Sequence, residues 1–260
     1  MLGNNRKSTV NRREDILKTL SEKGKVFVQE LSEKYQVSEV TIRNDLDKLE
    51  KKDLLIKARG GAIKVDFHVR SDQRISEKYQ INIKEKARIG KLASQQIENY
   101  DTIIIDSGST TAELAKNLNR FEDLTVITNA VNIINILLNI PGINIIVPGG
   151  YLRKNSNSLI GPPAEENLRK FHVDKLFLGV DGFDSSVGLY TPNIEEAHLN
   201  QLMIDNSNEI IVLSDSSKFK RKSLAFICGV KKINKLITDD GIDPKDMKQL
   251  QDAGIEVLIA

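Results

Sequence analysis

The amino-acid sequence predicts an α/β protein in two parts, a small N-terminal head and a larger domain with a mainly parallel sheet. In the first 64 residues, apolar residues recur at helical spacing three times, and two short β-prone stretches with Gly60-Gly61 between them follow. Beyond residue 83, apolar runs of strand length alternate with helical stretches, as in α/β sheets. We therefore place the head at 1–64, a partly ordered linker at 65–82 and the α/β domain at 83–260.

The head is expected to contain three helices joined by tight turns. Apolar periodicity predicts them at 13–23, 29–35 and 39–51. Ser38 is expected to cap the third helix, because its hydroxyl can accept a hydrogen bond from an unpaired amide of the first turn. In that helix Ile42, Leu46 and Leu49 recur at i, i+4 and i+7, which gives a narrow buried stripe.

The polar face of the third helix carries side chains that can bind DNA. Hydroxyl and amide groups bond phosphates or base edges, and arginine pairs with guanine through two hydrogen bonds. The alternative is an ordinary solvated helix face. The arrangement of three short helices favours the DNA-binding interpretation, because such a domain can place its third helix in the major groove. The expected contacts from this region are Ser38, Thr41, Arg43, Asn44 and Lys48.

A β-hairpin is predicted beside the third helix. Residues 54–56 and 58–64 form its strands, and Lys57, Arg59 and Lys64 give it positive charge. Such a hairpin is the wing of a winged helix-turn-helix. We expect Arg59 to lie against the DNA backbone or in the minor groove while the third helix occupies the major groove.

The charge of the chain is divided unevenly between its two parts. The formal net charge is +2 at pH 7. Residues 1–64 hold 15 basic and 10 acidic side chains, and the remaining residues hold 23 basic and 26 acidic ones. A head of net charge +5 on a body of −3 is typical of a DNA-binding domain joined to a ligand-binding domain.

Composition argues against several other classes. No stretch approaches the roughly 18 consecutive apolar residues of a membrane helix, and the first 25 residues do not resemble a signal peptide. Cys228 is the single cysteine, which excludes an internal disulfide framework and fits a reducing cytoplasm. The three histidines lack the paired spacing of a metal site. We therefore expect a cytoplasmic protein without a metal or a cofactor.

Seven apolar runs predict the strands of the larger domain. They lie at 102–105, 124–127, 143–147, 175–180, 209–213, 235–237 and 256–259. Continuous apolar runs are typical of parallel strands that are buried on both faces.

Polar residues follow most of these strands, and ligands bind such sheets beyond the carboxyl ends of the strands. A single loop of this kind would be an ordinary turn, but five at one edge indicate a site. The candidate ligand-binding residues are Asp106, Ser107, Gly108, Ser109, Thr110, Thr111, Asn129, Gly149, Gly150, Arg153, Asp181, Glu195 and Lys218.

The chemistry of these residues suits a phosphorylated sugar. The hydroxyls and amides of Ser109, Thr110 and Thr111 can hold a phosphate, with Arg153 or Lys218 nearby. The carboxylates of Asp106 and Asp181 and the amide of Asn129 suit sugar hydroxyls. Asp106 is expected beside the sugar rather than the phosphate, since two anions in contact repel.

Several segments resemble the DeoR family of bacterial regulators. In the head the resemblance lies in "VSEVTIRNDLDKLE" and "ARGGA", and in the larger domain in "IIDSGSTTAELA", "VPGGYLRKNSNSLIGPPAEENL", "FLGVDGFD", "NIEEAHLNQLMI" and "VLSDSSKFKRKSL". The family's sensor domain is similar to ribose-5-phosphate isomerase and glucosamine-6-phosphate deaminase. The resemblance implies a repressor of a sugar or amino-sugar catabolic operon that a phosphorylated sugar releases or modulates from double-stranded operator DNA. It also implies a homo-oligomer, either a dimer or a tetramer.

The alternative is a phosphosugar isomerase or deaminase fused to a DNA-binding head. The segment 181–184, Asp-Gly-Phe-Asp, resembles an isomerase loop. Isomerases continue with a Lys-Gly-Gly-Gly segment, whereas this chain has Thr-Pro-Asn-Ile-Glu-Glu at 191–196. Glu195 and Lys218 could still act as acid–base groups. The missing lysine favours a sensor over an enzyme.

Overall fold

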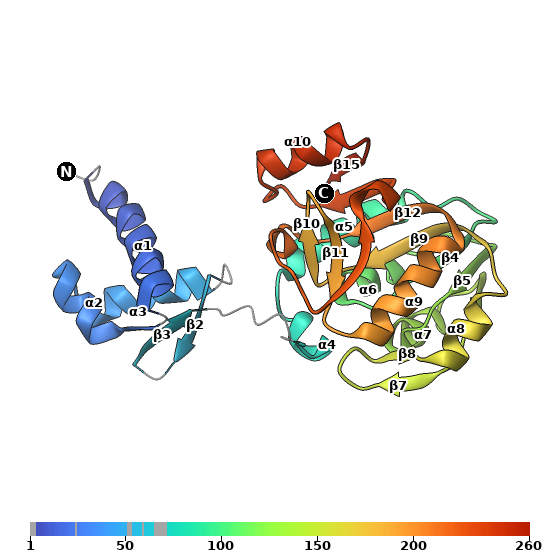
Figure 1. The fold of residues 1–260 in the computed structure, drawn as a ribbon, viewed down its shortest axis with the longest axis horizontal. Helices are drawn as coiled ribbons and strands as arrows, with labels where there is room; N and C mark the ends of the chain where they lie inside the picture. Colours follow the sequence, from blue (N-terminus) through green and yellow to red (C-terminus); the bar gives the residue numbers. More distant parts are fainter. Residues whose placement is uncertain (1–3, 24, 51–53, 59, 65–71) are drawn as a thin grey trace. The chain divides into compact units, whose positions relative to one another are not determined.

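The computed structural model describes residues 4–23, 25–50, 54–58, 60–64 and 72–260 of the 260-residue chain. The chain divides into two compact units, Met1–Phe67 and His68–Ala260. Figure 1 shows the helices and strands of both. Each unit is described by itself.

The first unit is a three-helix head with a small antiparallel sheet. Its elements are α1 (Asn4–Lys23), β1 (Lys25–Phe27), α2 (Val28–Tyr35), α3 (Glu39–Glu50), β2 (Leu55–Ala58) and β3 (Gly61–Lys64), and its sheet has the order β1-β3-β2. Ile16, Leu20, Ile42 and Leu46 are among the buried side chains that join α1 to α3. Helix α1 begins nine residues before the predicted start, because its first turns are polar and carry no apolar periodicity.

Two local features shape the head: the Ser38 cap that the sequence predicts, and a close contact at Gly61, which begins β3 instead of lying between the hairpin strands. The hydroxyl of Ser38 accepts a hydrogen bond from the Thr41 amide at 3.3 Å, which caps α3. Gly61 lies where β1 and β3 approach closely, and a Cβ atom there would stand 2.1 Å from the Val26 carbonyl oxygen. Only glycine fits this position of the wing.

The second unit contains a seven-stranded sheet of order β15-β14-β12-β9-β4-β5-β6, and every neighbouring pair is parallel. The predicted α/β fold class is therefore confirmed, and each predicted strand matches an observed one to within two residues at either end. The strands are β4 (Thr102–Ile105), β5 (Leu124–Ile127), β6 (Ile143–Ile146), β9 (Val173–Gly179), β12 (Ser207–Leu213), β14 (Lys235–Thr238) and β15 (Glu256–Ile259).

Helices cover both faces of this sheet. Ile103 and Ile105 pack on one face with α5 (Ile83–Ser94), α6 (Ser109–Ala115) and α7 (Val131–Leu137). Ile104 packs on the other face with α8 (Pro162–Leu168), α9 (Ile194–Asp205) and α10 (Pro244–Asp252). In Figure 1, α9 lies in front of the strands and α5 and α6 lie behind them. Both faces of β4 are thus buried, as its unbroken apolar run requires.

Short antiparallel elements add to the sheet that the sequence predicts. Strands β7 (Tyr151–Arg153) and β8 (Ser158–Ile160) form a hairpin, and β10 (Gly182–Asp184), β11 (Gly188–Thr191) and β13 (Ala225–Gly229) form a second sheet. Two 3-10 turns, Ser216–Lys218 and Val230–Lys232, complete the unit. These strands have three to five residues, too few for an alternating pattern to stand out in the sequence.

The structure corrects the expected linker. Residues 72–82, which include the short helix α4 (Ile75–Lys78), belong to the second unit. Ile75 is 5% exposed and its amide donates to the Asn155 carbonyl at 2.7 Å. The Asn82 side chain donates to Asp215 at 2.9 Å. The position of residues 72–82 could not be predicted from the sequence, because it depends on polar contacts with residues far away in the chain. Residues 65–71 lie outside the described residues.

Among the residues that the structure describes, no helix combines the length and the apolar character that crossing a membrane requires.

Candidate functional site

A crevice is expected at the carboxyl ends of β4 and β9, where the order of the strands reverses. From β4 the chain proceeds to β5 and β6 on one side of the sheet, and it later returns to β9 on the other side. The loops after β4 and β9 therefore diverge, and ligands of open α/β sheets bind at such a point.

A cavity lies at this point. It is lined by the loops after β4 and β9, by the turn after β12, by α9 and by α4. The lining residues are Ile75, Lys78, Asp106, Ser107, Gly108, Ser109, Thr110, Ser156, Gly179, Val180, Asp181, Thr191, Glu196, Asn200 and Lys218.

Seven of the predicted ligand-binding residues meet in this cavity: Asp106, Ser107, Gly108, Ser109, Thr110, Asp181 and Lys218. Arg153 lies behind it, with its guanidinium 2.9 Å from the Ser156 hydroxyl and 3.2 Å from Glu196. The other predicted residues are outside the lining: Thr111, Asn129, Gly149, Gly150 and Glu195.

Thr111 and Asn129 are buried beneath the site rather than in it. The Thr111 side chain has no exposed surface, and its hydroxyl donates to the Gly108 carbonyl at 3.2 Å. Asn129 is 2% exposed and its amide donates to the Leu159 carbonyl at 3.3 Å. These hydrogen bonds tie down the segments that follow β4 and β5, and they leave both side chains outside the cavity lining.

The structure also corrects the choice of glutamate on α9. Glu195 is exposed, whereas Glu196 is buried and lines the cavity. The Glu196 amide donates to the side chain of Asn193, the N-cap of α9. Successive helical residues point about 100° apart, so only one of two adjacent glutamates can face the site. The sequence alone does not say which.

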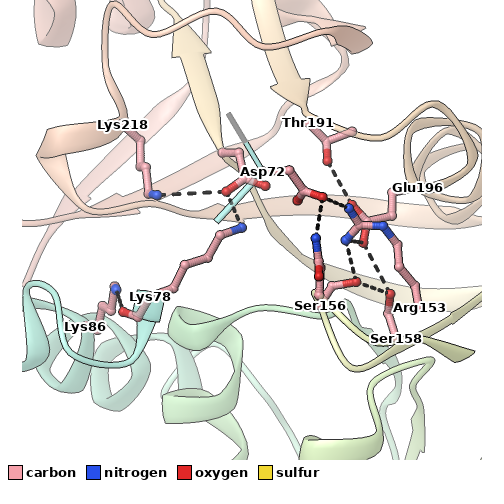
Figure 2. Close-up of polar contacts among 11 residues, drawn as sticks. Asp72, Lys78, Lys86, Arg153, Ser156, Ser158, Thr191, Glu196 and Lys218 are labelled. Carbon is pink, nitrogen blue, oxygen red and sulfur yellow. Dashed lines mark hydrogen bonds and ion pairs between the residues drawn. The ribbon is translucent and has the colours of Figure 1, made fainter. Parts of the chain in front are cut away.

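Charged groups surround the site, and Figure 2 shows the side chains of Lys78 and Lys218 converging there. Lys78 is ion-paired with Asp181, and the Lys218 ammonium lies 3.9 Å from the same carboxylate. Burial alone would raise the pKa of Asp181, but the two ammonium groups outweigh it and lower the pKa below its ordinary value. Burial lowers the pKa of Lys218, and the Lys78 charge adds to this effect.

The pKa of Asp106 is shifted in the opposite direction from that of Asp181. The Asp106 side chain is buried, and this desolvation, together with the negative charge of Glu196, raises its pKa to about 8. Near neutral pH the Asp106 carboxyl group is therefore largely protonated and can donate a hydrogen bond. The cavity lining thus combines the ammonium groups of Lys78 and Lys218, the ionised carboxylate of Asp181, the protonated carboxyl group of Asp106 and the side chain of Glu196.

A polar network joins Arg153 to the wall of the cavity (Figure 2). The guanidinium is paired with Glu196 and with Asp72. Glu196 also accepts hydrogen bonds from the hydroxyls of Ser158 and Thr191, at 3.2 and 3.1 Å. These contacts fix the Glu196 carboxylate at the edge of the cavity.

Several lining residues were missed by the sequence analysis. Ser156, Glu196 and Asn200 lie within segments that carry the family resemblance, so a signal for them was present. Lys78 had no such signal, because it lies in the segment interpreted as linker. Its role as a lining residue follows from the docking of α4.

In the head, a shallow groove runs along one flank of α3. It is lined by Arg12, Arg13, Val37, Ser38, Thr41, Asn44, Asp45 and Lys48, which include four of the predicted DNA contacts. Arg43 lies outside it, about 130° around the helix axis from the others, and pairs with Glu39 at 2.6 Å. Arg59 lies outside the described residues.

The groove is backed by a buried ion-pair cluster. Asp45 on α3 is 2% exposed and receives Arg12 at 2.6 Å and Arg13 at 2.7 Å, both from α1. These contacts fix the angle between α1 and α3. They leave the groove with an excess of positive charge, since Lys48 also lines it.

Within the described part of the chain, no group of three or more His, Cys, Asp or Glu side chains could hold a metal ion.

Comparison with known proteins identifies both units. Residues 12–66 match the DeoR-like helix-turn-helix domain, and residues 81–240 match the DeoR C terminal sensor domain. The chain is 40% identical over 252 residues to the "Putative aga operon transcriptional repressor" of Escherichia coli O157:H7, covering 96% of this chain and 94% of that protein. It is 34% identical over 244 residues to the "HTH-type transcriptional repressor GlcR" of Bacillus subtilis, covering 94% and 93%.

A third relative and a solved structure are also similar. The "Lactose phosphotransferase system repressor" of Staphylococcus epidermidis is 30% identical over 250 residues, with 95% of this chain and 98% of that protein covered. The alignment with the structure of ribose 5-phosphate isomerase A from Methanocaldococcus jannaschii covers 53% of this chain and 55% of that chain. The sequence identity is 18% and the TM-score is 0.40.

Proposed function

The chain belongs to the DeoR family of DNA-binding transcriptional regulators, and we propose that it represses a sugar or amino-sugar catabolic operon until a phosphorylated sugar binds its sensor domain. The family and the three relatives named above by their repressor names are regulators rather than enzymes, so the alternative of an isomerase or deaminase is set aside. The observation that carries the proposal is the cavity at the strand-order reversal, where charged residues from separate loops meet.

The head supplies the DNA contacts in this proposal. Helix α3 enters the major groove, with Thr41, Asn44 and Lys48 on one flank and Arg43 on the other. Ser38, whose hydroxyl lies 3.0 Å from that of Thr41, adds a phosphate contact. Arg59 in the wing reaches the adjacent backbone or minor groove.

The sensor domain supplies the effector site. Ser109 and Thr110 hold the phosphate through their hydroxyls and amides, with Lys78 and Lys218 as cations. Thr111 is not part of this proposal, because its hydroxyl is already bound within the loop. The side chains of Asp106, Asp181 and Glu196 form hydrogen bonds with the sugar hydroxyls. Arg153 holds Glu196 in position.

In this proposal, operator DNA is bound by more than one subunit. Two or more subunits in the cytoplasm place their α3 helices in successive major grooves of repeated or palindromic half-sites. The ligand changes the relative placement of the heads only to the extent that it binds the two arrangements with different affinity. No cofactor is needed for this cycle.

The decisive experiment is binding of the full chain to the promoter region of its own operon, titrated with a panel of sugar phosphates. The panel contains glucose 6-phosphate, glucosamine 6-phosphate, N-acetylgalactosamine 6-phosphate and ribose 5-phosphate, with inorganic phosphate and the unphosphorylated sugars as controls. We expect one sugar phosphate to release the DNA and the controls to have little effect. Release by a free sugar at the same concentration would contradict the phosphate site.

A further inference from the structure

Residues 72–82, which we call the strap, contact the loops at the carboxyl edge of the sheet. The Ile75 amide donates to the Asn155 carbonyl at 2.7 Å, in the turn between β7 and β8. The Tyr79 hydroxyl accepts from Asn132 on α7 at 2.6 Å. Further contacts include the ion pairs Asp72–Arg153 and Lys78–Asp181 and the hydrogen bonds from Asn82 to Asp215 and Ser217. The strap therefore joins four separate parts of the effector-site edge.

Two partly buried ion pairs hold the strap in place (Figure 2). The side chains of Arg153 and Lys78 are only 12% and 16% exposed. Ion pairs at this depth are less screened by water and salt than surface pairs. The Asn155 side chain reinforces the first pair by donating to Asp72 at 2.8 Å. Release of the strap thus requires that several charged groups lose their partners together.

The strap is also a wall of the cavity. Ile75 and Lys78 line it beside Asp181 and Lys218. A ligand that fills the cavity contacts these two side chains when the strap is docked and loses the contacts when the strap is released. By linkage, a ligand favours the arrangement in which it makes more contacts.

We propose that the strap is part of the effector site, and that a bound sugar phosphate stabilises its docked position through Lys78 and Ile75. This inference rests on the proposed function. Residues 65–71 connect the strap to the head in the chain, so the strap is the part of the site nearest to the head in sequence. Operator DNA then favours the state with a released strap, and the ligand dissociates the complex by lowering the population of that state.

The first test is hydrogen exchange of the full chain with and without each sugar phosphate of the panel, with a parallel thermal-shift assay for binding. We expect peptides from residues 72–82 to exchange more slowly with the sugar phosphate that raises the melting temperature. Binding of no sugar phosphate would contradict the proposed function and this inference with it. Binding and operator release without added protection of residues 72–82 would overturn the inference alone.

The second test uses Asp72→Asn, which removes an ion pair from the strap without changing a residue that lines the cavity. We expect the variant to need about five- to tenfold more sugar phosphate for half-release of the operator, within the usual range of coupling. It should also bind the operator more tightly without ligand, because the released state is more populated. An unchanged or lower half-release concentration would overturn the inference.

Two further variants control this measurement. Glu77→Gln also removes a negative charge from the strap, but Glu77 is exposed, so the half-release concentration of this variant should stay within about twofold of wild type. Asn155→Ala removes one hydrogen bond to Asp72 and should act in the same direction as Asp72→Asn, to a smaller extent. It provides the test if Asp72→Asn folds poorly. Equal effects of Glu77→Gln and Asp72→Asn would overturn the inference.

Discussion

At the scale of single residues, burial places the carboxyl group of Asp106 in surroundings that disfavour its charge. The loop after β4 holds it beside Glu196, and its pKa rises to about 8. A protonated carboxyl group can donate a hydrogen bond to a sugar oxygen, which an ionised one cannot. Above its ordinary pKa, the burial of Asp106 therefore costs stability, and it provides a hydrogen-bond donor for the ligand.

We predict that Asp106→Asn weakens the response to ligand without weakening DNA binding. The amide nitrogen of asparagine cannot accept a hydrogen bond, as the hydroxyl oxygen of the protonated carboxyl group can, so a contact with the sugar is lost while the head is unchanged. Thermal shift with the effective sugar phosphate is the measurement, since a ligand stabilises by about RT ln(1+[L]/Kd). The variant should gain far less stability than wild type. An equal gain would show that Asp106 does not contact the ligand.

The raised pKa of Asp106 predicts that the stability of the folded chain depends on pH, and Asp106→Asn is the reference protein. The folded chain retains a proton on Asp106 that the unfolded chain releases near its ordinary pKa of 3.8. The stabilising contribution is therefore complete below that ordinary pKa and is lost as the pH rises toward about 8. Relative to Asp106→Asn, wild type should lose on the order of a few kcal/mol of unfolding free energy between pH 5 and 9. Parallel stability curves for the two proteins over this interval would contradict the raised pKa.

At the scale of elements, Asp45 is the contact that fixes α3 against α1. Asp45→Ala leaves Arg12 and Arg13 partly buried without their counter-ion, so we predict that the head loses about 2–4 kcal/mol of unfolding free energy. Asp47→Ala is the matched control, because Asp47 lies on the same helix and its ion pair with Lys57 of β2 is exposed. Chemical denaturation of the chain should separate the two variants. Similar losses of unfolding free energy in the two variants would show that the burial of the Asp45 ion pairs does not add to stability.

The two flanks of α3 give a prediction about operator recognition. Arg43→Ala and Asn44→Ala should each cost about 1–3 kcal/mol of operator binding if the side chain reads a base, with the loss concentrated at one position of the site. If Arg43 binds a phosphate instead, the loss is similar on all sequences and the salt slope falls by about one unit. Operator titrations at two salt concentrations distinguish these cases. Unchanged affinity for Arg43→Ala would place the interface on the Asn44 flank alone.

The elements differ in how far the sequence could predict them. The seven strands of the large sheet are continuous apolar runs, so their positions follow from hydrophobicity alone. The strap contains a four-residue helix and docks through polar contacts to residues up to 135 positions away, which no local pattern reveals. The site residues follow the same division. Asp106 and Asp181 are fixed by the strands that end before them, whereas Glu196 and Lys78 depend on helix orientation and docking.

At the scale of the whole molecule, we predict that the active regulator is a dimer or a tetramer. A single head reads only one half-site, and paired heads fit half-sites whose centres are separated by about 34–36 Å or a multiple of it. Native mass spectrometry should give the subunit number, and footprinting on the operator should show two or more protected half-sites. A monomer that protects one half-site with full affinity would contradict the prediction.

The central position of β4 has a consequence for how the protein acquires its fold during synthesis. Strand β4 emerges first among the seven, yet its partner β9 ends about 70 residues later, and Ile105 pairs with Phe177. At a translation rate of about 5–20 residues per second, β4 waits about 4–15 s for this partner. During that interval one hydrogen-bonding edge of an apolar strand is open to other nascent chains. Ser109 and Thr110, in the first turn of α6, are joined by the lining residues that follow β9 only when β9 is made, so the new chain can bind its ligand only late in synthesis.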